Sequence, residues 1–341
     1  MATTHFAKWR ERLIDRPASP SAPTPAPMTV FVFSGGALNG AAQVGMLEEL
    51  YARGITPDAV VGVSAGAINA VNLAADPIKW HARIHHSWRA VAMNGIFQKS
   101  SSRAVWAILR QRVSLDPGTL LRAVIRDELP VARLEDCVIP VRIGTVVLAT
   151  GEMHWWGSGP AYELLLASCA IPGVFPPVTI DGQLHVDGGV CSPVPVVAAI
   201  DFNPTRLVVL DVSLTTDDQP YDMKDPSALT VLLRSFEAAR RRVSAAELAA
   251  ITPDIEVIYI RAGSTVGFGD ANAARITALI DEGRVAARTV LDELYPVPSA
   301  KPTARILSLS AKTPTPARRP GLRILAPSRA SISARPRRRL P

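Results

Sequence analysis

Short apolar runs alternate along the chain with longer segments whose apolar residues recur at helical spacing. The runs predict strands over 30–33, 59–61, 138–148, 207–212 and 255–260. The helical spacing predicts helices over 41–50, 65–74, most of 80–129, 229–251 and 271–294. Strands that alternate with helices favour a mostly parallel sheet, because each crossover returns the chain to the same edge. We therefore predict an α/β fold with a mostly parallel central sheet and helices on both faces, a three-layer α/β/α arrangement.

A GxSxG motif stands at one of these strand-to-helix junctions. It runs from Gly62 through Ser64 to Gly66, directly after the 59–61 strand and directly before the 65–74 helix. A serine hydroxyl becomes a useful nucleophile when a sharp turn holds it exposed beside a base. Side chains at Gly62 and Gly66 would collide with the neighbouring strand and helix backbones. The motif predicts a nucleophile elbow, and the alternative is a glycine-rich turn with an incidental serine.

A glycine-rich loop follows the first strand and opens the next helix. Its sequence from Ser34 to Gly40 is SGGALNG. The first amides of a helix lack acceptors and lie at its positive end, so they bind a phosphate or an oxyanion. The glycines are not spaced as Gly-x-Gly-x-x-Gly, and no acidic ribose ligand follows a second strand. An oxyanion hole is the favoured interpretation.

A lone aspartate completes the set. Asp187 ends the short alternating stretch 183–187 and precedes Gly188 and Gly189. An aspartate before glycine is commonly a turn residue that binds its own backbone. Its position downstream of an elbow and a glycine loop makes it a candidate base.

In this order the three motifs resemble those of the patatin-like phospholipases, a family of lipid acyl hydrolases. The resemblance runs from about 28 to 211 and includes 167–177, which is similar to the segment before the family's aspartate. It implies that Ser64 is the nucleophile and Asp187 the base of a Ser/Asp dyad. The remaining implied site residues are the oxyanion-hole amides of Gly35, Gly36 and Ala37 and the motif glycines Gly40, Gly62, Gly66, Gly188 and Gly189. A lipid or another acyl ester is the implied substrate, with no cofactor and no catalytic metal.

Two positions depart from the family pattern. Ala37 stands where a third glycine is usual, and Asn39 stands where an arginine or lysine is usual. If residue 37 needs positive φ, alanine costs about 1 kcal/mol there. Because the oxyanion is bound by main-chain amides, we expect these changes to tune the geometry. An acyltransferase on the same dyad and a catalytically weakened interaction protein on the same scaffold remain alternatives. The 80–129 segment either roofs an acyl pocket or is an ordinary helical layer.

The histidines and cysteines disfavour other chemistries. No histidine follows Asp187, so a Ser/Asp/His triad would need an unusual order using His154 or His185. His81 and His85 are spaced i, i+4 without the glutamate of HExxH, so we expect no zinc site. The three cysteines lack a CxxC spacing and are predicted to be thiols.

Composition and charge divide the chain into three parts. We predict an N-terminal segment with a Pro-rich linker (1–27), a catalytic domain (28–296) and a disordered basic Pro/Arg-rich tail (297–341). The tail contains eleven Lys and Arg and no acidic residue. Its formal charge of +11 therefore exceeds the net charge of the whole chain, which is +7. It is either a solvated extension or a peripheral contact with anionic membrane surfaces. Nucleic-acid binding is not expected, since no aromatic residue is interleaved with these charges. With no apolar run of about 18 residues and no signal-peptide core, we expect a cytoplasmic protein.

Overall fold

The computed structural model describes residues 28–94, 114, 116–213, 228–263 and 272–295. The chain divides into a unit of residues 1–297 and a second of 298–341, and the second lies wholly outside these ranges. The predictions for the N-terminal segment, the linker and the basic tail therefore also lie outside the described residues. So does the middle of the 80–129 segment, including Phe97, Trp106 and Leu109.

The sheet has eight strands within the described residues. Five of them form a parallel core in the order β3-β2-β1-β7-β8: β3 (Val141–Val147), β2 (Ala59–Gly62), β1 (Thr29–Phe33), β7 (Arg206–Asp211) and β8 (Glu256–Arg261). Three short strands pair in the antiparallel direction. β4 (Met153–Trp156) and β6 (Gln183–Asp187) each pair with β3, and β5 (Val178–Ile180) pairs with β6. The predicted mostly parallel sheet is confirmed.

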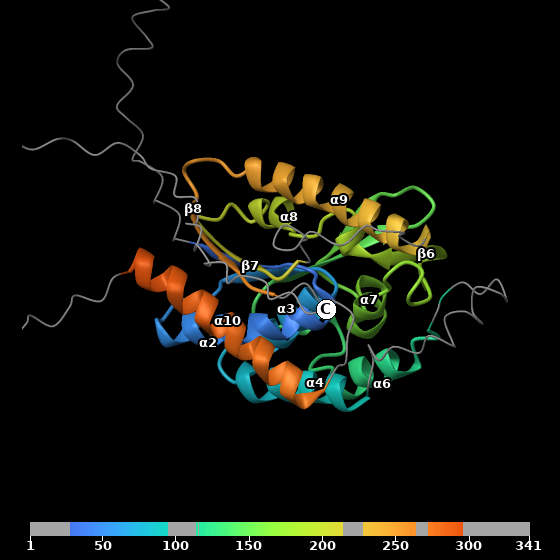
Figure 1. Ribbon diagram of the computed structural model, residues 1–341, viewed down its shortest axis with the longest axis horizontal. Coiled ribbons are helices and arrows are strands. Elements are labelled where there is room, and N and C mark those ends of the chain that lie inside the picture. Colours follow the sequence, from blue (N-terminus) through green and yellow to red (C-terminus); the bar gives the residue numbers. More distant parts are fainter. Residues whose placement is uncertain (1–27, 95–113, 115, 214–227, 264–271, 296–341) are drawn as a thin grey trace, which may run out of the picture. The chain divides into compact units, whose positions relative to one another are not determined.

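Helices cover both faces of this sheet (Figure 1). On one face lie α2 (Ala42–Ala52), α3 (Ala65–Ala75), α4 (Trp80–Asn94), α6 (Thr119–Glu128), α7 (Ala161–Ser168) and α10 (Ala273–Leu294). On the other lie α8 (Val196–Ile200) and α9 (Ala228–Ala249). Short 3-10 turns occupy Ala37–Ala41 (η1), Leu134–Asp136 (η2) and Gly188–Val190 (η3). The α/β/α fold class is therefore confirmed as well.

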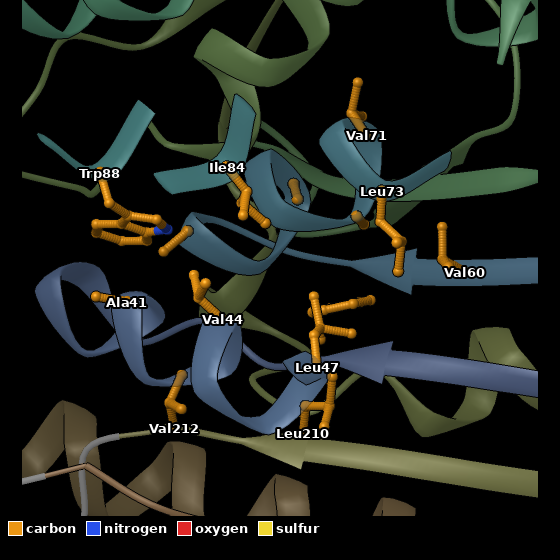
Figure 2. Packing of buried hydrophobic residues seen from close by; sticks show 14 of the residues in the cluster. Ala41, Val44, Leu47, Val60, Val71, Leu73, Ile84, Trp88, Leu210 and Val212 are labelled. Carbon is orange, nitrogen blue, oxygen red and sulfur yellow. The ribbon is translucent and has the colours of Figure 1, made fainter. Parts of the chain in front are cut away.

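The alternation of side chains in β1 explains the two cores. Phe31 and Phe33 point into the larger cluster with α2, α3 and α10, whereas Val30 and Val32 point into the smaller cluster with α8. All four are fully buried, which is why the central strands read as continuous apolar runs. In Figure 2, Leu47 of α2 lies against Leu210 of β7 within the larger cluster.

Helices α2 and α10 cross closely enough to require glycine. A Cβ at Gly45 would lie 1.9 Å from the Ile280 carbonyl oxygen, and one at Gly283 would lie 1.8 Å from that of Ala42. This crossing fixes α2, the helix that continues from the glycine loop. No helix among the described residues combines the length and the apolar character needed to cross a bilayer.

Candidate active site

Ser64 occupies a strained turn between β2 and α3. Its φ of 57° and ψ of −131° lie in a region that non-glycine residues rarely adopt, at a cost of about 1–3 kcal/mol. The flanking glycines permit the turn, because a Cβ at Gly62 would lie 2.5 Å from the Gly66 carbonyl oxygen. A Cβ at Gly66 would lie 2.5 Å from the carbonyl oxygens of Phe33 and Ser34. The elbow geometry predicted from the motif is thus present.

The backbone of the elbow is tied to the neighbouring helix by a serine. The Ser64 N–H donates to Ser168 Oγ at 3.0 Å, and the Ser168 hydroxyl donates to the Gly144 carbonyl of β3 at 2.8 Å. Ser168 is fully buried at the end of α7. It lies in the 167–177 segment, but no sequence pattern predicted this contact.

Asp187 lies at the end of β6, opposite Thr145 of β3, and its carboxylate meets the Ser64 hydroxyl. Both side chains are buried. Asp187 Oδ1 also accepts the Gly189 N–H at 2.7 Å. Burial raises the pKa of Asp187 to about 6, while the hydrogen bonds from Ser64 and Gly189 and the positive charge of Arg240 act to lower it.

The turn after Asp187 also depends on its paired glycines. A Cβ at Gly188 would lie 2.4 Å from the Gly144 carbonyl oxygen, and one at Gly189 would lie 3.0 Å from Asp187 Oδ1. The same Cβ position at Gly189 would lie 3.2 Å from Arg240 Nη2, so the guanidinium group of Arg240 borders the turn. Arg240 comes from α9, on the opposite face of the sheet from α3, and no local pattern predicted its approach.

The glycine loop presents its amides beside Ser64. The Gly35 N–H donates to the Pro193 carbonyl at 3.0 Å. Among the residues that the structure describes, the N–H groups of Gly36 and Ala37 have no hydrogen-bond acceptor. Ala37 has a φ of 48°, the positive value anticipated for this position. A Cβ at Gly36 would lie 2.4 Å from the Val212 carbonyl oxygen, and one at Gly40 would lie 2.7 Å from the Trp88 ring.

Buried amide side chains hold this loop in place. Gln43 Nε2 donates to the carbonyls of Ser34 and Leu210, at 3.0 and 2.9 Å. Asn69 Nδ2 donates to the Gly40 carbonyl at 2.9 Å and to Gln43 Oε1 at 2.8 Å, and Trp88 Nε1 donates to Asn69 Oδ1 at 3.0 Å. The sequence analysis missed this network. Its signal was an amide side chain flanked by apolar residues in each of two helices, Gln43 in α2 and Asn69 in α3, because a buried amide needs hydrogen-bond partners.

An apolar pocket opens directly at Ser64. Its lining comes from the elbow, the glycine loop, α4, α6 and α7's following turn: Ala37, Ser64, Ala65, Ile68, Trp88, Val91, Leu121, Cys169, Ile171 and Phe175. Ile68, Trp88 and Val91 also line a second apolar pocket that reaches Leu129 and Glu128. The 80–129 segment was expected either to roof an acyl pocket or to form an ordinary helical layer. Its described parts, in α4 and α6, supply one wall of the pocket at Ser64.

The histidines and cysteines that the sequence analysis considered for other chemistries have contacts of their own. His185 Nδ1 is 3.0 Å from Thr145 Oγ1, and His154 stacks on Trp156. Within the described ranges, neither histidine hydrogen-bonds Ser64 or Asp187. The three cysteines are free thiols, and burial raises the pKa of Cys169, which is fully enclosed beside the elbow. Asn39 is fully buried with its amide beside Gly263.

Comparison with known proteins identifies the family. The sequence profile described as patatin-like phospholipase matches residues 31–200, so through this region the chain belongs to that family. An uncharacterised NTE family protein of Mycobacterium tuberculosis is 29% identical over 190 residues, 55% of this chain and 50% of that protein. Lysophospholipase NTE1 of Mycosarcoma maydis is 24% identical over 189 residues, 55% of this chain and 10% of that protein.

The chain thus spans about half the length of its mycobacterial relative and much less of the fungal one. Among solved structures, VipD from Legionella pneumophila superposes with a TM-score of 0.47 at 16% identity, covering 79% of this chain and 67% of that one.

Proposed function

We propose that this protein is a serine lipid acyl hydrolase that cleaves acyl esters through Ser64 and Asp187. The observation that carries the proposal is the contact between the Ser64 hydroxyl and a buried carboxylate, beside two loop amides that have no acceptor within the described part of the chain. Membership of the patatin-like phospholipases and the similarity to a fungal lysophospholipase support it. The side chains that line the pocket at Ser64 are almost all apolar, which is the chemistry that a fatty acyl chain requires.

The reaction follows from the arrangement of these groups. Asp187 accepts the Ser64 proton as the oxygen attacks the ester carbonyl, and the resulting oxyanion binds the N–H groups of Gly36 and Ala37. The Gly35 amide, also assigned to the hole by the resemblance, is engaged by Pro193 and keeps the loop in place. Collapse of the intermediate expels the alcohol, which takes the proton from Asp187. Water, deprotonated by Asp187, then releases the acyl group from Ser64.

The pKa of Asp187 suits this role. A general base works best when its pKa lies near the operating pH, and burial brings Asp187 to about 6. An oxyanion donor typically contributes about 2.7–4 kcal/mol to the transition state, so the loop amides matter as much as the base. The two departures, Ala37 and Asn39, leave the main-chain donors of Gly36 and Ala37 available.

The decisive experiment compares the wild type with Ser64→Ala, Asp187→Asn and the double variant on p-nitrophenyl acyl esters and lysophospholipids. We expect each single variant to lose at least about a thousandfold in kcat, and the double variant to lose little more, because the two residues act as a unit. Ser158→Ala and Asp181→Asn, both exposed, are matched controls that should retain full activity. Residual activity above a tenth of wild type in Ser64→Ala or Asp187→Asn contradicts the assignment.

The same dyad also serves an acyltransferase, since only the acceptor differs. Adding a lysophospholipid acceptor to the ester assay distinguishes the two, because a transferase forms a diacyl product at the expense of free fatty acid. If the wild-type protein binds the ester but does not turn it over, the alternative of a catalytically weakened interaction protein is favoured instead.

A further inference from the structure

A second cluster of ligand-type side chains lies on the surface between α2 and α4. Glu48 belongs to α2, and His81 and His85 lie one turn apart on α4. The Nε2 atoms of both histidines are 2.8 Å from the same oxygen, Oε1 of Glu48. One ligand atom from each residue lies within 4.8 Å of the others, and the centroids of the two imidazole rings are 4.5 Å apart.

This donor set has the chemistry of a transition-metal site. Residues at i and i+4 share one face of a helix, so the two imidazoles are already directed to one point. Zinc binds imidazole nitrogen and carboxylate oxygen at about 2.0–2.2 Å in a tetrahedral arrangement, which brings the ligand atoms close to one another. His81 is 60% exposed, which leaves solvent access for a fourth ligand.

Arg284 of α10 supports the carboxylate from behind. Its Nε and Nη2 donate to Glu48 Oε2, at 3.0 and 2.6 Å, which leaves Oε1 directed at the histidines. Metal-binding carboxylates are commonly fixed by such outer hydrogen bonds. Arg284 also pairs with Asp281, so its positive charge is shared between two carboxylates.

We propose that Glu48, His81 and His85 form a structural site for a divalent transition-metal ion, with zinc as the ion that best matches the donors. Sequence spacing alone argued against zinc because HExxH supplies its glutamate from within the same helix. Here the carboxylate comes from a different helix, 33 residues upstream of His81. The bound ion would tie α2, which continues from the glycine loop, to α4, which supplies Trp88 to the apolar pocket. The site is separate from Ser64 and independent of the proposed hydrolase activity.

The test uses the full-length untagged chain, freed of metal by chelation and gel filtration. Titration calorimetry with ZnCl2 should give one ion per chain, and zinc should raise the Tm whereas the same concentration of MgCl2 should not. Cobalt should give the visible absorption of a tetrahedral site. Each of His81→Asn, His85→Asn and Glu48→Gln should weaken zinc binding at least about tenfold.

His86→Asn is the matched control, because His86 is adjacent on α4 but pairs with Glu128 instead. It should bind zinc like the wild type. His81→Asn is the most informative variant, because an exposed side chain can be replaced without disturbing the core, and circular dichroism checks that the variant is folded. Equal zinc affinity in wild type and His81→Asn, or no stoichiometric binding to the wild type, overturns the site and leaves a hydrogen-bonded cluster.

Discussion

Two carboxylates of this protein, Asp187 and Glu48, meet opposite electrostatic environments. Asp187 is fully enclosed, accepts bonds from a hydroxyl and one amide, and has a pKa raised to about 6. Glu48 keeps some contact with solvent, meets two imidazoles and an arginine, and has a pKa lowered to about 2. Burial acts in the same direction on both. The number of strong donors therefore decides which carboxylate takes up a proton near neutral pH and which stays an anion.

This difference fits the two proposed roles. A base must be able to hold the proton that it removes, and too many cationic partners would abolish that ability. A metal ligand must stay deprotonated, and the two hydrogen bonds that Arg284 donates to Oε2 favour the ionised form of Glu48. Arg240 is the one cation that contributes to Asp187's pKa among the described residues, and it acts less strongly than burial.

The largest expected effect is on the pH dependence of catalysis. Because the base must be ionised, log kcat/KM should fall with unit slope below pH 6, about a hundredfold by pH 4. Arg240→Met removes a charge that lowers the pKa of Asp187, so the midpoint should move to higher pH. A pH–rate profile on a soluble ester measures both. Arg242→Met, exposed on the same helix, should leave the midpoint unchanged. A flat wild-type profile between pH 5 and 8 would exclude Asp187 as the base.

A smaller effect is expected on stability, with opposite sign at the two carboxylates. The folded pKa of Asp187 lies above its ordinary 3.8, so its stabilising contribution is complete below pH 3.8 and is lost as pH rises through about 6. Asp187→Asn should therefore raise the free energy of unfolding at pH 8 by about 1–3 kcal/mol. That advantage should shrink toward pH 4.

Glu48 provides the reverse case. Its folded pKa is lowered from 4.5, so its contribution is present above pH 4.5 and is lost as pH falls through about 2. Glu48→Gln should lower the free energy of unfolding at pH 8 by at least about 1 kcal/mol, because charge-assisted bonds to Arg284 and the histidines are lost. Urea unfolding of both variants at pH 8 and pH 5 makes the comparison. The same sign for both at pH 8 would refute the electrostatic difference.

The sequence predicted those parts of the fold and site that are encoded locally. The central strands β1, β2 and β7 are buried on both faces, so apolar runs such as 30–33 and 207–212 identified them. Ser64 and Asp187 stand in short motifs whose glycines have backbone reasons to be there. Strands β4 and β5 escaped prediction because three or four residues carry too little periodicity. Arg240 and Ser168 escaped because their contacts depend on how distant helices pack.

A modest effect is expected from restoring the family's glycine at residue 37. Ala37 has positive φ, which costs a non-glycine residue about 1 kcal/mol, but glycine also loses more chain entropy on folding. Ala37→Gly should therefore change the free energy of unfolding by less than about 1 kcal/mol in urea titrations. The N–H donor is retained, so kcat should stay within about threefold. A rise in KM of more than about threefold would mean that the side chain of Ala37, which lines the apolar pocket, contributes to substrate binding.

The smallest expected effect is that of metal removal on catalysis. If zinc occupies the Glu48 cluster and Asp187 alone supplies the base, EDTA should lower the Tm of zinc-loaded protein and leave kcat on a soluble ester unchanged within about twofold. The reason is that neither Ser64 nor Asp187 contacts Glu48, His81 or His85 among the described residues. Parallel thermal unfolding and ester assays, with and without added ZnCl2, provide the measurement, and His81→Asn should show no change in Tm. A loss of kcat that zinc restores in the wild type but not in His81→Asn would join the two sites through α2 and the glycine loop. Such a result would show that the position of this helix, as well as the ionisation of Asp187, controls the rate of catalysis.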